Sequence, residues 1–540
     1  MTSKKNKTAL ISIYHKENIE KFAKKLVDLG WDILASGGTA KYLEEHGIKV
    51  RDVAELVGGK AILGHRVVTL SREVHAGLLA RKENKEDLEE LERLGIPFID
   101  LVCVDLYPLE EAIAKPDANY DSVIEATDIG GPTLLRSAAK GGRIVISEPE
   151  DREKLIEILR NKGNLLQEER ANFAAKAECV VAKYCLESAK FHSEEKCNGM
   201  MGGQISETLY GENPHQVPGR LYSNGSDDPL ALDKFQVLTE MASSYNNACD
   251  IDRMLQTMTH LVAAFGINKI SAKYFGLAVK HGNCCGAAYG DDKIEVIKKT
   301  IEGDPRAIFG GLAMFNFEID EEKAEIILTH LMENEQRRLL DGIIAPSISQ
   351  KAIAMMRRKK DKCRLIVNPA LTDLNKDSLD REKRFRYVRG GFLTQPNYTF
   401  VLDLANPEVK TWGDLGNRGN KGDLLLAWAI SATSNSNTIT LVKSGKLIGN
   451  GVGQQDRVGC CELAIKRAKD AGHNTNGAAA ASDSFFPFPD GPKTLISAGV
   501  KAIFSTSGSL KDEETQRLCG ERGVILVQIP DKLARGFFGH

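Results

Sequence analysis

A lysine and a histidine stand side by side at Lys280 and His281, directly after the apolar run Leu277–Val279 and before Gly286. The pattern predicts a strand that ends in a glycine-flanked polar loop, and such loops are where α/β folds hold ligands. A neutral imidazole can take a proton near pH 7, and a neighbouring ammonium can stabilise developing negative charge. The pair therefore indicates a general base, His281, with Lys280 as its electrostatic partner. For a lone Lys-His pair the commoner arrangement is a histidine bonded to a backbone carbonyl, with the lysine in solvent.

A second polar segment favours the catalytic interpretation. An expected strand, Thr438–Val442, follows the polar run that ends at Asn437, and it precedes a glycine-rich loop over 449–453 and then Arg457. The chain thus has two strands whose ends carry polar side chains that could face one ligand.

The run 482–490 gives a third segment of the same kind. It places three phenylalanines, Phe485 among them, beside prolines and ends at Asp490. Such a run suits neither a helix interior nor a central strand. It suits a rigid apolar wall for a flat ligand.

Near the amino terminus, a short polar motif separates an expected strand from an expected helix. Its residues are Ser36, Gly37, Gly38 and Thr39. Glycines let the backbone approach a ligand, and free N–H groups at a helix start attract an anion, so the motif is a candidate phosphate cradle. A plain strand-to-helix turn capped by Thr39 explains the motif equally well. Arg66 follows at a place where it could grip a phosphate.

Three more residues stand at the ends of expected elements. Tyr107 follows the apolar strand Phe98–Leu106, Asp128 precedes a glycine turn, and Lys140 ends the helix after that turn. A carboxyl, a phenol and an ammonium could supply the proton transfers of a ring closure. Each is individually more often structural, as a helix cap or as a side-chain tip in water.

The elements that position these residues alternate between strand and helix. Strands are expected over Thr8–Tyr14 and Asp32–Ala35, with helices over Asn18–Leu29 and Ala40–His46. Strands separated by helices predict a parallel sheet covered on both faces. Residues 151–197 have helical spacing, and a glycine-rich segment after them marks a domain boundary.

The composition limits which classes of protein the chain could belong to. The 540 residues are 42% apolar and 27% charged with a net charge of −2, which gives no reason to expect a nucleic-acid or membrane surface. Eleven cysteines never form a Cys-x-x-Cys motif, so reduced thiols and no metal site are expected. No apolar run approaches ~18 residues. A cytoplasmic location is therefore expected.

Taken together, the motifs resemble those of the bifunctional purine-biosynthesis family, AICAR transformylase/IMP cyclohydrolase. The resemblance covers essentially the whole chain. It is carried by Lys280-His281-x-Asn283, Ser436-Asn437, 451–455, 483–488, His540, 36–41, 74–77, 105–108, 128–131 and 135–140.

The resemblance implies an α/β fold with four parts. Residues 1–150 would form a methylglyoxal-synthase-like cyclohydrolase domain with a parallel sheet, and 151–199 a helical connector. Residues 200–385 and 386–540 would form two cytidine-deaminase-like transformylase subdomains. The family also implies a homodimer and no metal requirement.

The resemblance further implies two reactions. The amine of AICAR would attack the formyl group of 10-formyltetrahydrofolate to give FAICAR, with His281 as base, Lys280 steadying charge and Asn437 facing the oxyanion. Ring closure of FAICAR to IMP would then use Tyr107, Asp128 and Lys140. The implied substrate contacts are Lys16, Ser36, Gly37, Gly38, Thr39, Arg66, Thr69, Asp105, Tyr210, Gly310, Asp341, Arg457, Phe485 and Asp490.

Departures from the family pattern leave an alternative open. Val68 stands where the family has an active-site lysine, Leu209 where it has an arginine, and Cys284 where it has a proline. The chain could therefore be a purine-nucleotide-binding relative whose transformylase is retained and whose cyclohydrolase is weak or lost. A zinc deaminase would need His-x-Glu followed by Pro-Cys-x-x-Cys, and the second half of that pattern is missing.

Overall fold

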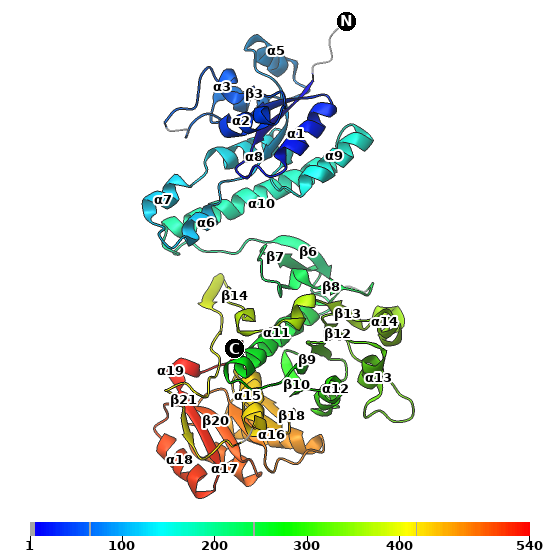
Figure 1. Cartoon of the computed structure of the whole chain (residues 1–540), viewed down its shortest axis with the longest axis vertical. Helices are drawn as coiled ribbons and strands as arrows, with labels where there is room; N and C mark the ends of the chain where they lie inside the picture. Colours follow the sequence, from blue (N-terminus) through cyan, green and yellow to red (C-terminus); the bar gives the residue numbers. More distant parts are fainter. Residues whose placement is uncertain (1–5, 64–65, 241–242, 417, 540) are drawn as a thin grey trace. The chain divides into compact units, whose positions relative to one another are not determined.

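The computed structural model describes residues 6–63, 66–240, 243–416 and 418–539, and the terminal His540 lies outside them. The chain divides into two compact units, Met1–Gly203 and Gln204–His540 (Figure 1). Each is described by itself.

The first unit contains a five-stranded parallel sheet in the order β3-β2-β1-β4-β5. The strands are β1 (Lys7–Ser12), β2 (Trp31–Ala35), β3 (Arg51–Asp52), β4 (Ile99–Val104) and β5 (Ile144–Ile146). The helices are α1 (Ile19–Asp28), α2 (Gly37–Glu45), α3 (Val53–Leu56), α4 (Arg72–Leu79), α5 (Lys85–Arg93), α6 (Leu109–Ala114), α7 (Tyr120–Glu125), α8 (Gly130–Lys140), α9 (Asp151–Lys162) and α10 (Gln167–His192). The predicted alternation of strands and helices is confirmed.

The helices expected as a connector over 151–199 belong to this first unit. In α9, Leu155, Ile156 and Leu159 are buried in the core on one face of the sheet. In α10, Ala177 and Val181 are buried in the core on the other face. Apolar residues at helical spacing are thus used for packing, so this stretch extends the domain.

The second unit is built on one twelve-stranded sheet in the order β16-β21-β20-β19-β17-β18-β10-β9-β11-β12-β13-β8. Its strands are β8 (Gln236–Val237), β9 (Tyr274–Lys280), β10 (Asn283–Gly290), β11 (Leu312–Phe315), β12 (Gly342–Ala345), β13 (Arg364–Val367), β16 (Lys410–Trp412), β17 (Thr438–Lys443), β18 (Lys446–Val452), β19 (Ala479–Ser482), β20 (Ala502–Ser507) and β21 (Ile525–Pro530). Two separate hairpins pair β6 (Gly203–Thr208) with β7 (Gly219–Ser223), and β14 (Lys383–Val388) with β15 (Gly391–Pro396).

The helices lie on both faces of this sheet. They are α11 (Tyr245–Ile267), α12 (Lys293–Glu302), α13 (Glu321–Thr329), α14 (Gln350–Met356), α15 (Arg418–Ala432), α16 (Arg457–Asp470), α17 (Asp490–Ser497), α18 (Asp512–Glu521) and α19 (Asp531–Ala534). One core joins α11 and α15 to one face (Figure 1). On the other face, one core packs α12, α13 and α14 against the sheet, and a separate core packs α16, α17 and α18.

The sheet contains a structural repeat. In the first copy a long helix, α11, precedes the antiparallel hairpin β9–β10, and the remaining strands extend the sheet as β9-β11-β12-β13. In the second copy α15 precedes the hairpin β17–β18, and the strands continue as β17-β19-β20-β21. The copies meet where β10 pairs antiparallel with β18. The two expected subdomains therefore share one sheet and form one compact unit; their cytidine-deaminase-like character stays a prediction.

Two local predictions for this unit are wrong. The loop expected after Lys280 is a two-residue hairpin turn, and Cys284 lies in the strand β10. The glycine-rich loop expected at 449–453 is mostly the strand β18. A Cβ at Gly449 or Gly451 would lie 2.3 Å from a carbonyl oxygen of α16, so these glycines allow a helix to pack closely on the strand.

Candidate functional site

The hairpin turn that carries His281 opens into a cavity of about 350 Å³. Lys280 and His281 line it from the first repeat, and Asn450 and Val452 line it from the second. The Asn450 side-chain amide donates to the Cys284 carbonyl at 3.0 Å, which ties β18 to β10 beside the turn. The cavity is therefore made where the two repeats meet.

The backbone around Lys280 gathers several predicted residues at one end of the sheet. The Lys280 ammonium donates to the Phe309 carbonyl at 2.6 Å, and a Cβ on Gly310 would lie 4.0 Å from Nζ. The Asp341 N–H donates to the Gly311 carbonyl at 2.9 Å, and the Asp341 carboxylate lies 3.6 Å from Arg358. The structure thus places Lys280, Gly310 and Asp341 at the same end of the sheet, and their roles stay predictions.

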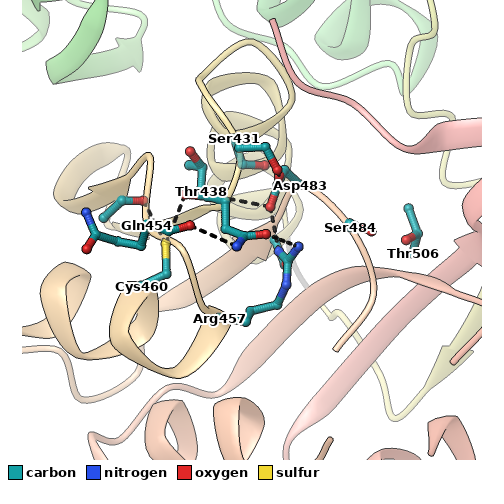
Figure 2. A network of polar contacts seen from close by, with 12 residues as sticks. Ser431, Thr438, Gln454, Arg457, Cys460, Asp483, Ser484 and Thr506 are labelled. Carbon is teal, nitrogen blue, oxygen red and sulfur yellow. Dashed lines mark hydrogen bonds and ion pairs between the residues drawn. The ribbon is translucent and has the colours of Figure 1, made fainter. Parts of the chain in front are cut away.

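Asn437 precedes β17 and is held by a polar network whose members Gln454, Arg457 and Asp483 are labelled in Figure 2. Arg457 donates to the Asn437 side-chain oxygen at 2.7 Å, and the Asn437 side-chain amide donates to the Gln454 carbonyl at 2.9 Å. Thr438 pairs with Val452, which lines the cavity, so Asn437 stands next to the cavity. The arginine fixes the orientation of the amide, with the N–H₂ turned away from Arg457.

Arg457 itself is engaged by protein groups. Its guanidinium donates to Asp483 at 2.5 Å and to the Ser482 hydroxyl at 2.7 Å. Asp483 is fully buried and also accepts from the Thr438 backbone N–H at 3.1 Å. Arg457 was predicted as a substrate contact, whereas these bonds show it supporting Asn437. Sequence reasoning had no signal for the Arg457–Asp483 pair, because only folding brings the two residues together.

The other predicted transformylase contacts are not among the residues that line this cavity. Phe485 is half-buried with the Arg535 guanidinium 5.6 Å from its ring, and Phe486 beside it is a core residue. Asp490 is exposed at the start of α17. Tyr210 lies in the turn between β6 and β7. The three-phenylalanine run is thus partly core and only partly an open wall.

In the first unit, the predicted phosphate cradle lies at the carboxyl ends of parallel strands. Ser36 follows β2 and its hydroxyl lies 2.9 Å from that of Ser12, while α2 begins at Gly37. Thr39 is buried, and its hydroxyl donates to the Ile13 carbonyl at 3.2 Å. The backbone N–H groups of the helix start remain the element suited to an anion, whereas the Thr39 side chain holds the chain after β1.

Lys16 and Asp105 lie together at this same edge. The Asp105 carboxylate accepts from the backbone N–H groups of Tyr14 and His15, the latter at 3.2 Å. The Lys16 ammonium donates to the carbonyls of Ile13 and Tyr14. Burial lowers the pKa of Lys16, and the Asp105 charge opposes that change. Burial likewise raises the pKa of Asp105.

Tyr107 and Asp128 also meet here, and their predicted role in ring closure stays a prediction. The Tyr107 backbone N–H donates to Asp128 at 3.4 Å, and burial raises the pKa of both side chains. The Asp128 carboxylate also accepts from the Gly131 N–H at 2.8 Å at the start of α8. Tyr184 of α10, which sequence reasoning missed, accepts from the Asp128 N–H at 2.6 Å, and burial raises its pKa to about 12.

Of three further predicted residues of this unit, Lys140 stands apart from Asp128, whereas Thr69 lies beside it at the start of α8. Lys140 ends α8 whereas Asp128 precedes it, so at 1.5 Å per residue the helix separates them by about 15 Å. The structure therefore does not bring Lys140 to this edge within one chain. Arg66 is exposed and paired with Glu125. Thr69 is buried against the start of α8, where a Cβ on Gly130 would lie 2.8 Å from its hydroxyl.

Comparison with known proteins covers both units. A family model described as AICARFT/IMPCHase bienzyme matches residues 138–467, and one described as MGS-like domain matches 18–133. The chain belongs to the AICARFT/IMPCHase bienzyme family. The predicted family and its methylglyoxal-synthase-like first domain are thereby confirmed.

Curated relatives of this bienzyme family match over nearly the full length. The bifunctional purine biosynthesis protein PurH of Bacillus cytotoxicus is 35% identical over 96% of this chain and 98% of its own. PurH of Aquifex aeolicus is 35% identical with the same coverage. A solved structure titled crystal structure of ForH is 36% identical, covers 35% of this chain and all of its own, and has a TM-score of 0.31. The full-length matches do not favour the alternative of a relative reduced to one activity.

The described residues also bear on metals and membranes. Among them, no group of three or more His, Cys, Asp or Glu side chains could hold a metal ion. No described helix has both the length and the apolar character to cross a membrane. All eleven cysteines are unpaired, as predicted.

Proposed function

We propose that the cavity at the junction of the two repeats is the formyl-transfer site of a bifunctional purine-biosynthesis enzyme. The observation that carries this proposal is one cavity that Lys280 and His281 line from the first repeat and Val452 lines from the second, with Asn437 next to Thr438, the pairing partner of Val452. A proton acceptor, a cation and an oriented amide N–H donor are the groups that an acyl transfer from nitrogen to nitrogen needs.

In the proposed reaction, the amine of AICAR attacks the formyl carbon of 10-formyltetrahydrofolate. His281 takes a proton from that amine, while Lys280 and the Asn437 amide face the oxygen that becomes negative. Collapse of the tetrahedral intermediate breaks the bond to the folate nitrogen, which leaves with a proton. Arg457, which Asp483 holds, bonds the Asn437 side-chain oxygen. One hydrogen of the Asn437 amide goes to the Gln454 carbonyl, and the other would be the one offered to the oxyanion.

For the first unit, we propose ring closure of FAICAR to IMP at the carboxyl edge of the five-stranded sheet. The start of α2, with Ser36, Gly37 and Gly38, would bind the nucleotide phosphate beside Lys16. Asp128 and Tyr107 are the proton-transfer groups. Burial raises the pKa of Asp128 towards the working range, which supports this role, and it raises the pKa of Tyr107, which keeps the phenol protonated as a donor. Asp105 holds the loop that carries Lys16.

The proposal is tested by measuring both reactions separately in full-length protein. We expect His281→Ala to lower formyl transfer by ~10²–10⁴-fold and to leave cyclisation of supplied FAICAR intact. Asp128→Asn should show the reverse pattern. Loss of both activities in either variant with an unchanged melting temperature would contradict the assignment of one reaction to each unit.

We also propose a cytoplasmic homodimer that needs no metal. The hairpin β14–β15 is exposed on both strands, with Phe392 and Leu393 pointing into solvent, and an isolated two-stranded hairpin is marginally stable. A second copy would cover it. Sedimentation should give twice the chain mass of 59.2 kDa, and dialysis against a chelator should leave both activities unchanged.

A further inference from the structure

The hairpin turn that carries His281 has a left-handed backbone. His281 has φ 54° and Gly282 has φ 70°. A residue with a Cβ is disfavoured in this region, so a histidine there needs support from its surroundings. The position of the imidazole therefore depends on whatever holds this turn.

Asp250 of α11 provides that support. Its carboxylate, which is 8% exposed, accepts from the Gly282 N–H at 2.6 Å. Burial raises the pKa of Asp250, and hydrogen bonds from the Gly282 and His281 N–H groups oppose that rise. Backbone N–H groups bonded to a carboxylate make short, strong hydrogen bonds.

The second repeat contains the same arrangement without the histidine. Ser444 and Gly445 form the turn between β17 and β18 with φ 55° and 76°. Asp423 of α15 accepts from both of their N–H groups at 2.7 Å, and burial raises its pKa as well. The carboxylate clamp is thus a device of the fold, used twice, and only one copy holds a residue suited to chemistry.

We infer that Asp250 is a positioning residue for formyl transfer, which clamps the turn so that the His281 imidazole faces the cavity. This inference rests on the proposed role of His281. A displacement of about 1 Å at a reacting group can cost ~10²-fold in rate. Loss of the clamp should therefore appear in kcat of formyl transfer more than in KM, because substrate contacts on the second repeat are untouched.

The experiment compares Asp250→Ala with Asp423→Ala, the matched change in the second repeat. Both variants lose the bond from the carboxylate to the hairpin turn, and Asp423→Ala also loses the hydrogen bond from Tyr289, so Asp423→Ala should melt at a temperature as low as that of Asp250→Ala or lower. Only Asp250→Ala should lose kcat of formyl transfer, by ~10–100-fold per folded enzyme. Cyclisation of FAICAR in the first unit should be normal in both. Asp250→Asn, which keeps one acceptor oxygen, should recover part of the rate.

A second measurement separates positioning from general destabilisation. Introduced into the His281→Ala background, Asp250→Asn should cause no further loss of the residual formyl transfer, because the residue acts through the imidazole. The inference would be overturned if Asp250→Asn lowered formyl transfer as much in the His281→Ala background as in the otherwise unchanged enzyme. It would also be overturned if Asp250→Ala and Asp423→Ala had equal kcat. If Asp250→Ala does not fold, the same comparison is made with Asp250→Asn and Asp423→Asn. Normal activity of His281→Ala itself would instead overturn the proposed function.

Discussion

The two repeats of the second unit make matching hydrogen bonds from backbone N–H groups, but the side chains that accept these bonds differ. Asn316 of the first repeat accepts from the Phe275 N–H at 2.8 Å, and Asp483 of the second accepts from the Thr438 N–H at 3.1 Å. These residues end matching strands, β11 and β19. At the start of each hairpin, a backbone N–H thus donates to the side chain at the end of the neighbouring strand. The acceptor is a neutral amide in the first repeat and a carboxylate in the second.

That difference extends to the helix that follows each hairpin. Arg457 begins α16 and bonds to Asn437, whereas Lys293 begins α12 and lies over the Tyr274 ring at 5.1 Å. The His281 turn and the Ser444 turn lie at opposite ends of the β10–β18 pair. The Asn437 amide and the Arg457–Asp483 ion pair lie at the same end as His281. The fold thus builds two similar hairpin turns, and a few side chains decide which one carries a group suited to acid–base chemistry.

The largest expected effect comes from making the two turns alike. His281→Ser gives the first turn the residue that the second turn already holds at φ 55°. Formyl transfer should fall by ~10²–10⁴-fold because the base is lost, with little change in melting temperature. Steady-state rates and a melting curve check this, and Ser444→His is the control, expected to leave the rate unchanged. A gain of rate in the control would show that both turns are competent.

The next effect concerns the helix starts. Arg457→Ala leaves the fully buried Asp483 without its cation and releases Asn437, so formyl transfer should fall by ~10²–10³-fold and stability by ~3–5 kcal/mol. Denaturant unfolding and kinetics measure the two quantities. Lys293→Ala, at the matching place in the first repeat, should change both only slightly. Equal effects of the two substitutions would remove the distinction between the repeats.

The smallest effect tests whether the second turn is purely structural. Tyr289 donates to the Asp423 carboxylate at 3.1 Å, and Tyr289→Phe removes this hydrogen bond while the ring stays in place. Stability should fall by ~0.5–1.5 kcal/mol, and formyl transfer should keep its normal kcat. A clear loss of kcat would assign the second turn to the catalytic machinery.

The sequence by itself determined the local elements and the chemistry available. Alternating apolar runs located β1, α1, β2 and β4 to within a few residues, because side-chain periodicity depends only on near neighbours. Motif order indicated the family, and residue types identified Lys280, His281, Asn437 and Asp128 as the groups with useful acid–base or hydrogen-bonding properties.

Only the tertiary structure decided which of these groups meet. Pairing of β10 with β18 places His281 and Val452 in the lining of one cavity, and burial joins Arg457 to Asp483 and the His281 turn to Asp250. Helix α8 separates Lys140 from Asp128, although both stand in one motif-rich stretch. Such contacts link residues far apart in the chain through strand pairing and burial, which periodicity and spacing do not encode.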